Sequence, residues 1–291
     1  MLEQDVVDPF EVLGSHEGLL YDYVRALIHL QLALPYTNRP DQDRRQRVHG
    51  GRAIGIRAPR DASGQYTWAA GTAGRIILHQ LLDHIRKTGC TALGHDELGS
   101  LFENAAFGEE TCLRQVQRLA ELTIEVSNPA GSVIEEKPVG VYGQDGLSVS
   151  PWLVSAVRAL PSLPSPAAVH EVSTVLRWRW HGGRSRQPIS PMPVDLLLWM
   201  TYVAPQVRDT ATVPLTVLQQ HIGTDTTAKK QSVYFLGLEL KDWLPGVNAQ
   251  FPDLSVTLTE TALVLAVDRR CDVAVYGVDS AIGQRFRRLR P

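Results

Sequence analysis

The stretch that most constrains the fold covers residues 193–268, where helix-forming and strand-forming segments follow one another in a fixed order. PVDLLLWMTYVA (193–204) opens with a proline, whose missing N–H has no helical partner in a first turn. A second helix is expected over 214–223 and a third over 226–244, which Pro245 and Gly246 then end. SVTLT (255–259) and LVLAV (263–267) predict a β-hairpin. This order is that of a winged helix, whose third helix commonly enters a DNA major groove.

The same succession is expected earlier in the chain, although the residues themselves do not repeat. Hydrophobic periodicity predicts helices over 73–87, 95–104 and 109–121, and strands near 122–126, 132–141 and 147–150. The predicted fold class is therefore α+β, with two tandem winged-helix domains. The expected divisions are an N-terminal helical segment (1–34), a first winged-helix domain (35–153), a linker or connecting subdomain (154–192), a second winged-helix domain (193–268) and a basic tail (269–291).

The remaining segments are assigned by the same signals. Residues 51–58 and 65–70 flank an Asp-Ala-Ser-Gly turn and predict a β-hairpin. The N-terminal helix is expected over 17–32, with apolar positions at Leu20, Tyr23, Val24, Leu27, Ile28 and Leu30. That apolar arc is wider than one packing partner requires. It indicates either contact with a second copy or a host protein, or a role in completing the core of the first domain.

Several of these segments together resemble the plasmid-encoded RepA replication initiators. DLLLWMTY, the helix-turn-helix after it and FPDLSVTLTETALVLAVD are similar to the C-terminal region of that family. LALPYTNRP, a strand-forming stretch and GTAGRIILHQLLDHIRKTG occur in the family's order, so the resemblance covers roughly residues 32–268. It implies binding to repeated double-stranded DNA sites at an origin, assembly of several copies, and recruitment of host replication proteins. Initiators of this kind often also repress their own promoter.

Composition excludes several other classes of protein. The three cysteines lack metal-binding or disulfide-framework spacing, and the acidic N-terminus is unlike a signal peptide, so a cytoplasmic protein is expected. No apolar run approaches the ~20 residues that span a bilayer, so no membrane association is expected. Phosphate-binding loops, dinucleotide fingerprints, nucleophile elbows and paired metal-binding histidines are also missing. We therefore expect no enzyme activity, no cofactor and no metal.

Net charge weighs against DNA binding, because phosphate contacts usually require a basic surface. The formal net charge is −2. Basic residues do gather, however, in three places: residues 177–186, the tail, and a stretch with Arg44, Arg45, Arg47, Arg52, Arg57 and Arg60. Two alternatives therefore stay open, a winged-helix transcriptional regulator and a protein-interaction scaffold. A continuous basic stripe on the third helices would favour DNA, and an apolar or acidic face would favour protein.

The third helix of the first domain offers the best base-reading candidates. Thr111, Arg114, Gln115 and Arg118 have the spacing of one helix face. Arginine can bond guanine through two donors, and glutamine can bond adenine in the same way. The alternative is an ordinary solvated helix face.

Other candidates would contact phosphates rather than bases. Lys229, Lys230 and Tyr234 lie near the start of the third helix of the second domain. Residues 176–181 alternate, so a strand would place Arg177 and Arg179 on one face, opposite two tryptophans. The loop that follows adds two further basic residues to this set, Arg184 and Arg186. The alternative is a half-buried strand with solvated arginines.

Overall fold

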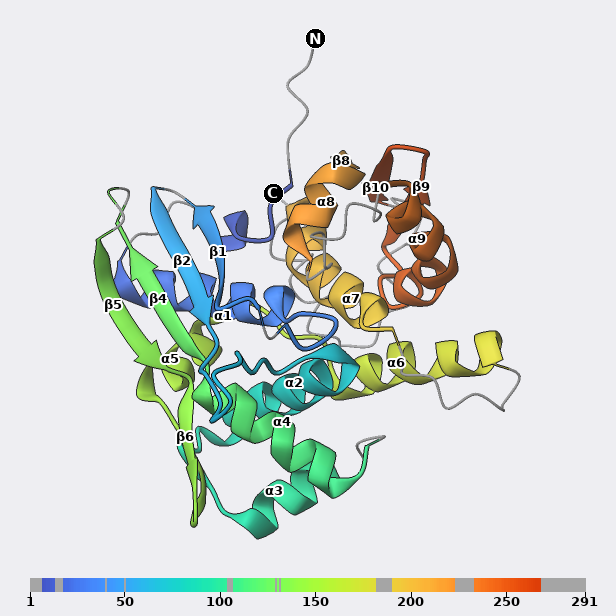
Figure 1. Cartoon of the computed structure of the whole chain (residues 1–291). Helices are drawn as coiled ribbons and strands as arrows, with labels where there is room; N and C mark the ends of the chain where they lie inside the picture. Colours follow the sequence, from blue (N-terminus) through green and yellow to red (C-terminus); the bar gives the residue numbers. More distant parts are fainter. Residues whose placement is uncertain are drawn as a thin grey trace.

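The computed structural model describes residues 7–13, 18–39, 41–49, 51–103, 107–128, 130, 132–181, 190–222 and 233–267. These ranges form helices and small antiparallel sheets, an α+β arrangement in which two similar units share one interior (Figure 1).

The first unit is a winged helix. Its three-stranded sheet has the order β3-β7-β6, so the short strand between the first two helices pairs with the last strand of the unit. Gly89 ends the first helix in a left-handed conformation (φ 70°), which glycine adopts without steric cost. The elements in order are α2 (Gly71–Thr88), β3 (Ala92–Leu93), α3 (His95–Phe102), α4 (Glu109–Glu121), β6 (Gly140–Gly143) and β7 (Gly146–Val149).

The second unit repeats this topology, because its sheet has the equivalent order β8-β10-β9. The predicted hairpin is confirmed, but Pro245 does not end the third helix, which continues to Asn248 with the proline inside it. Residues 223–232, including the predicted start of that helix, lie outside the described residues. The elements are α7 (Met192–Val203), η2 (Ala204–Gln206), β8 (Thr210–Pro214), α8 (Leu215–His221), α9 (Val233–Asn248), β9 (Leu254–Leu258) and β10 (Ala262–Val267).

A separate four-stranded sheet is formed by two strands that come before the first unit in the sequence and two strands inserted between α4 and β6. Its order is β1-β2-β4-β5, all antiparallel, and α1 (Leu19–Ala33) packs across one face (Figure 1). The predicted pairing of 51–58 with 65–70 is wrong, because the strand over 52–57 pairs with residues 44–49 instead. The Asp-Ala-Ser-Gly turn does form, but it closes a single isolated bridge. The strands are β1 (Arg44–His49), β2 (Arg52–Arg57), β4 (Thr123–Ser127) and β5 (Val133–Pro138).

Two helices occupy the stretch between the winged helices, α5 (Pro151–Ala159) and α6 (Pro166–His181). The strand predicted over 176–181 is wrong, because these residues are the last turns of α6. Ser165 precedes the helix and caps it, because its hydroxyl accepts a hydrogen bond from the Ala168 amide, and Pro166 is the first helical residue. These start signals outweigh a six-residue alternation.

The N-terminal helix is a core element. From Asp22 to Ala33 every residue of α1 is buried, and the helix packs against α2, α5, α7, β2 and β4. Of the six apolar positions predicted to form its face, Leu20 alone is exposed. Contacts within the chain therefore account for the wide apolar arc, so the arc gives no reason to invoke a second copy.

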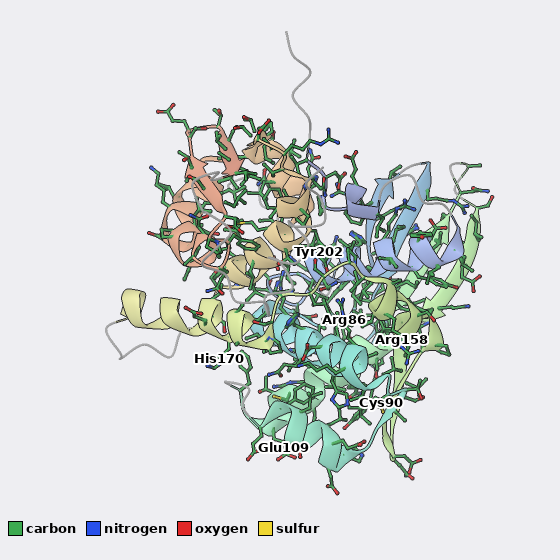
Figure 2. All side chains as sticks on the ribbon, turned by 180° about the vertical axis from the view of Figure 1, so that it is seen from behind. Arg86, Cys90, Glu109, Arg158, His170 and Tyr202 are labelled. Atoms are coloured by element: carbon green, nitrogen blue, oxygen red, sulfur yellow. The ribbon has the colours of Figure 1, made fainter. Side chains whose placement is uncertain are left out.

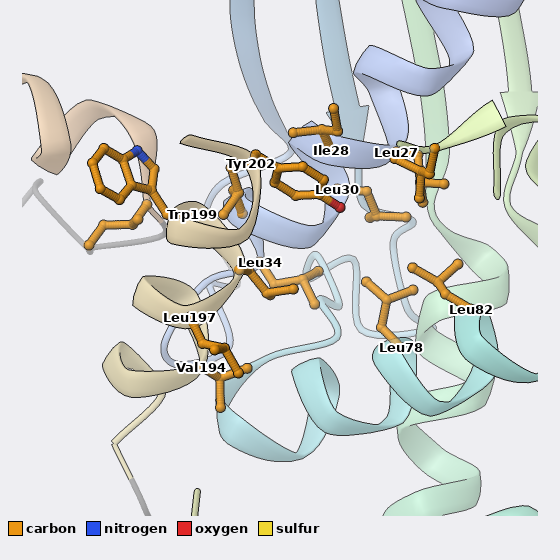
Figure 3. Packing of buried hydrophobic residues seen from close by; sticks show 14 of the residues in the cluster. Leu27, Ile28, Leu30, Leu34, Leu78, Leu82, Val194, Leu197, Trp199 and Tyr202 are labelled. Atoms are coloured by element: carbon orange, nitrogen blue, oxygen red, sulfur yellow. The ribbon is translucent and has the colours of Figure 1, made fainter. Parts of the chain in front are cut away.

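The two winged helices share a continuous interior. Figure 3 shows leucines of α1 and α2 in the same buried cluster as Val194, Leu197 and Tyr202 of α7. Within this interior, Arg75 of α2 and Asp195 of α7 form an ion pair whose side chains are both fully buried. The units are therefore packed together and not merely tethered.

A short N-terminal segment, residues 7–13, reinforces this junction from outside. Phe10 is 1% exposed and lies under the guanidinium of Arg47, 4.4 Å from its ring centre. Arg47 also pairs with Asp8 at 3.0 Å, and the main-chain carbonyl of Asp8 accepts a hydrogen bond from Gln206 of η2. The segment thus bridges β1 and the second winged helix.

We expect Asp195→Ala to lower the free energy of unfolding by about 3–5 kcal/mol, because the substitution leaves the Arg75 charge buried without a counter-ion. Urea unfolding followed by circular dichroism measures this loss. The control is Asp83→Ala, which breaks an exposed pair with Lys87 and should cost less than about 1 kcal/mol. Equal losses in the two variants would contradict the importance of the buried pair.

Candidate nucleic-acid interface

Helix α4 is the third helix of the first winged helix and has the predicted bounds. Two glutamates occupy its first turn and Arg118 its last, in the order that the helix dipole favours. Cys112, Val116 and Leu119 are buried against the neighbouring elements α2, α3 and β6. This packing fixes which side of the helix remains accessible.

Three of the four predicted base-reading residues lie on that accessible side. Arg114 is exposed, whereas Thr111 and Arg118 are half-buried. Arg114 approaches Glu110 at 3.9 Å, and Arg118 donates to the Trp68 carbonyl at 3.4 Å. Burial, followed by the charge of Arg114, lowers the pKa of Arg118 from its ordinary value. The side presents arginine donors, but both arginines already have partners within the protein.

The fourth residue, Gln115, does not point outward, so this part of the prediction is wrong. Its side chain is 7% exposed, and its amide oxygen accepts a hydrogen bond from the Ala70 main-chain amide at 3.1 Å. A Cβ at Gly74 would lie 3.2 Å from the same oxygen. Gln115 therefore holds the start of α2 against α4 and is not available to a base. Hydrophobic periodicity cannot show which way Gln115 points, since the boundary between the buried and exposed faces of α4 falls between Gln115 and its neighbours.

The accessible side of α4 is electrically mixed. Glu109, Glu110 and Glu121 accompany Arg114 and Arg118 along the helix. The described part of α9 is similar, with exposed Glu239, Lys241 and Asp242. Neither described helix carries a continuous basic stripe. The turns of the two hairpins contain Asp145 and Glu260 and no lysine or arginine.

The wing of the first unit, the β6–β7 hairpin, is fixed to α3 by a residue that sequence reasoning missed. The His95 ring nitrogen Nε2 lies 2.9 Å from the Gln144 carbonyl, and Nδ1 lies 3.4 Å from the Tyr142 hydroxyl. The His95 and Tyr142 rings meet edge to face. These partners are almost fifty positions apart in sequence, so no local pattern indicates the contact.

None of the other predicted site residues has a described side chain. Arg184, Arg186, Lys229 and Lys230 lie outside the described residues, and Tyr234 belongs to α9 without a described side chain. Arg177 and Arg179 lie in α6, whose side chains are not described there. The predicted common face of these two arginines required a strand, and these residues belong to a helix instead.

Comparison with known proteins supplies a fold and no family. No protein-family model matches the sequence, and no curated protein matches it significantly. A crystal structure of domains 2 and 3 of RctB matches over 90% of this chain and 99% of that chain, with a TM-score of 0.50 and 13% identity. The likeness is one of fold. The match nevertheless spans both winged helices, so their arrangement in one chain also occurs in a solved structure.

Within the described ranges, no helix is both long and apolar enough to cross a membrane. In the same ranges, no three metal-binding side chains gather closely enough to hold an ion.

We expect Gln115→Ala and Arg114→Ala to separate structural from surface roles on α4. Gln115→Ala should lower the free energy of unfolding by about 1–3 kcal/mol, because the Ala70 amide loses its acceptor. Arg114→Ala should change it by less than about 0.5 kcal/mol, since the side chain is exposed. Urea unfolding measures both. A destabilising Arg114→Ala beside a neutral Gln115→Ala would contradict the placement of these residues.

Proposed function

We propose that this protein is a DNA replication initiator that binds double-stranded DNA through its two winged helices. The observation that carries the proposal is the shared fold with domains 2 and 3 of RctB, a replication initiator, over 90% of the chain. Each unit has the topology in which a third helix commonly enters a major groove. Because the units share one interior, both helices belong to one body.

The finer proposal is a plasmid initiator of the RepA type. It rests on the sequence resemblance over roughly residues 32–268, including DLLLWMTY and GTAGRIILHQLLDHIRKTG. In this proposal several copies bind repeated sites at an origin and attract host replication proteins. Contact between copies would accompany that assembly. The chain is proposed to have no catalytic activity, so helicase and polymerase come from the host.

Within the first unit, we assign DNA contact to Thr111, Arg114 and Arg118 on α4. Arg114 has the exposure that base reading requires, and its long contact with Glu110 is the kind of surface pair that contributes little energy. In the second unit, Lys229, Lys230 and Tyr234 are assigned to the phosphate backbone. Arg184 and Arg186, and separately Arg177 and Arg179, are further candidates for phosphate contact.

A second candidate function is favoured by the mixed charge of the third helices. Exposed Glu109, Glu110 and Glu121 on α4, with Asp145 in the wing, suit a protein partner better than a phosphate backbone. In this alternative the first winged helix binds a protein and the second supplies DNA contact. The two proposals differ in which unit protects DNA.

Footprinting tests both candidates directly. The purified chain is incubated with the DNA that surrounds its own gene, and protection from hydroxyl radicals is mapped at single-nucleotide resolution. An initiator should protect an array of repeated sites, each spanning two contact regions. A single protected operator would favour a transcriptional regulator. Protection of only one contact region at each site would favour the protein-binding alternative, and no protection would contradict DNA binding by this chain.

We expect Arg114→Ala and Arg118→Ala each to weaken specific DNA binding by roughly 1–3 kcal/mol, because each removes a groove-facing cation. Binding is measured by fluorescence anisotropy on a protected site and on a scrambled one. Gln117→Ala, on the same exposed side but uncharged, is the matched control. Normal affinity in both arginine variants, with an unchanged footprint, would remove α4 from the DNA interface.

A further inference from the structure

A small hairpin between β2 and α2, residues 59–67, has a tip that does not pack against the hydrophobic core. Arg60 and Tyr66 form an isolated antiparallel bridge, and the Thr67 amide donates to the Pro59 carbonyl at 3.0 Å. Residues 61–65 at the tip are all exposed. No apolar side chain larger than alanine occupies this tip, so burial is not the reason for its shape.

The tip is nevertheless rigidly built. One carboxylate oxygen of Asp61 accepts hydrogen bonds from the Ser63 amide, the Ser63 hydroxyl and the Gln65 amide, at 2.8, 2.6 and 3.0 Å. These bonds lower the pKa of Asp61. Gly64 has φ 82°, a conformation in which other residues are strained. The hairpin therefore presents its residues in one conformation.

The base of the hairpin is attached to the accessible helix α4. The Trp68 carbonyl accepts from Arg118, and the Ala70 amide donates to Gln115. The Trp68 side chain is fully buried, and its indole N–H donates to the Gln42 carbonyl at 2.7 Å. The chain between β2 and α2 consequently runs beside α4 (Figure 1). The base of the hairpin therefore adjoins the second half of α4.

The arginines from 44 to 60 differ in what holds them. Arg44 and Arg57 both reach the buried carboxylate of Glu125, at 2.9 and 2.6 Å. Arg47 forms an ion pair with Asp8, and Arg52 forms one with Asp22. Arg45 donates a hydrogen bond to the Ala33 carbonyl. Five of the six are thus engaged by anionic or carbonyl oxygens.

Arg60 is the exception among the six. It is fully exposed, lies over the Tyr66 ring at 4.8 Å, and donates to the Tyr66 hydroxyl at 2.6 Å. Within the described ranges Arg60 forms no ion pair, but the hydrogen bond to Tyr66 and, to a smaller extent, the charge of Asp43 raise the pKa of Arg60. The tyrosine orients the cation without neutralising it, since a phenol is uncharged at neutral pH. The two wings, in contrast, carry an acidic residue and no cation in their turns.

We propose that the hairpin at residues 59–67 is a further DNA-backbone contact of the first winged helix, with Arg60 binding a phosphate beside the groove that α4 enters. This inference rests on the proposed DNA binding. A guanidinium held by stacking loses less conformational freedom on binding, and it has donors left for phosphate oxygens. The hairpin would then supply the charge that the acidic wing lacks.

The test compares Arg60→Gln with Arg158→Gln. Arg158, labelled in Figure 2, is also exposed and lies at the end of α5 beside Gly89. Gly89 follows the last residue of α2, whereas the hairpin adjoins the start of that helix. Arg60→Gln should weaken binding to specific and random duplexes alike, by about 3- to 10-fold at 0.1 M salt, and flatten the salt slope by about one unit. Arg158→Gln should do neither. Arg60→Lys should keep the slope, because it keeps the charge.

A second measurement locates the hairpin on the duplex. An iron–EDTA cleavage reagent is attached at Ser63→Cys or, as control, at Asp145→Cys, in a chain carrying Cys90→Ser and Cys271→Ser. Cleavage from position 63 should flank the protected groove. Parent-like affinity and slope in Arg60→Gln, or no cleavage from position 63, would overturn the hairpin assignment while DNA binding stands. A parent chain that binds no duplex would instead overturn the proposed function itself.

Discussion

The guanidinium of Arg75 and the carboxylate of Asp195 meet where neither side chain has any exposed surface. Burial of two charges costs several kcal/mol per ion unless the remaining hydrogen-bonding groups are satisfied. All five N–H donors of Arg75 have acceptors, namely both oxygens of Asp195 and the carbonyls of Leu34, Pro35 and Gly71. Two of these carbonyls follow α1, the third opens α2, and the carboxylate belongs to α7. One side chain therefore joins three helices.

This junction determines how the two winged helices relate to one another. Helix α4 packs on α2 and α9 packs on α7, so the buried pair lies between the supports of both third helices. Gln31 of α1 adds a buried hydrogen bond to the Tyr202 hydroxyl of α7 at 2.9 Å. Between the two units, α5 and α6 pack into the same interior. A duplex that contacts both third helices must therefore match a spacing that the core has already set.

The sequence predicted the elements that local signals define. The bounds of α4 follow from Gly108 and a strong apolar period, and the β9–β10 hairpin follows from alternation around a turn. Strands β3 and β8 were missed because each is short and pairs with a strand about fifty residues later in the chain. The orientation of Gln115 was also missed, since the Ala70 amide that attracts its side chain lies forty-five positions earlier. Where hydrophobic periodicity is ambiguous, contacts with residues remote in sequence determine the local structure.

The same distinction applies to charge. Along the sequence, the arginines from 44 to 60 form a dense basic stretch, which favours nucleic acid by composition alone. In the fold, Glu125 is 1% exposed and lies between Arg44 and Arg57, so two of those cations balance a buried anion of the four-stranded sheet. A Cβ at Gly55 would lie 2.7 Å from the Arg44 side chain, which needs that open space to reach the carboxylate. A high density of arginines in a sequence can therefore reflect buried carboxylates that need counter-ions as well as a positive surface. The contacts that each arginine makes within the protein determine whether it is available to bind a phosphate.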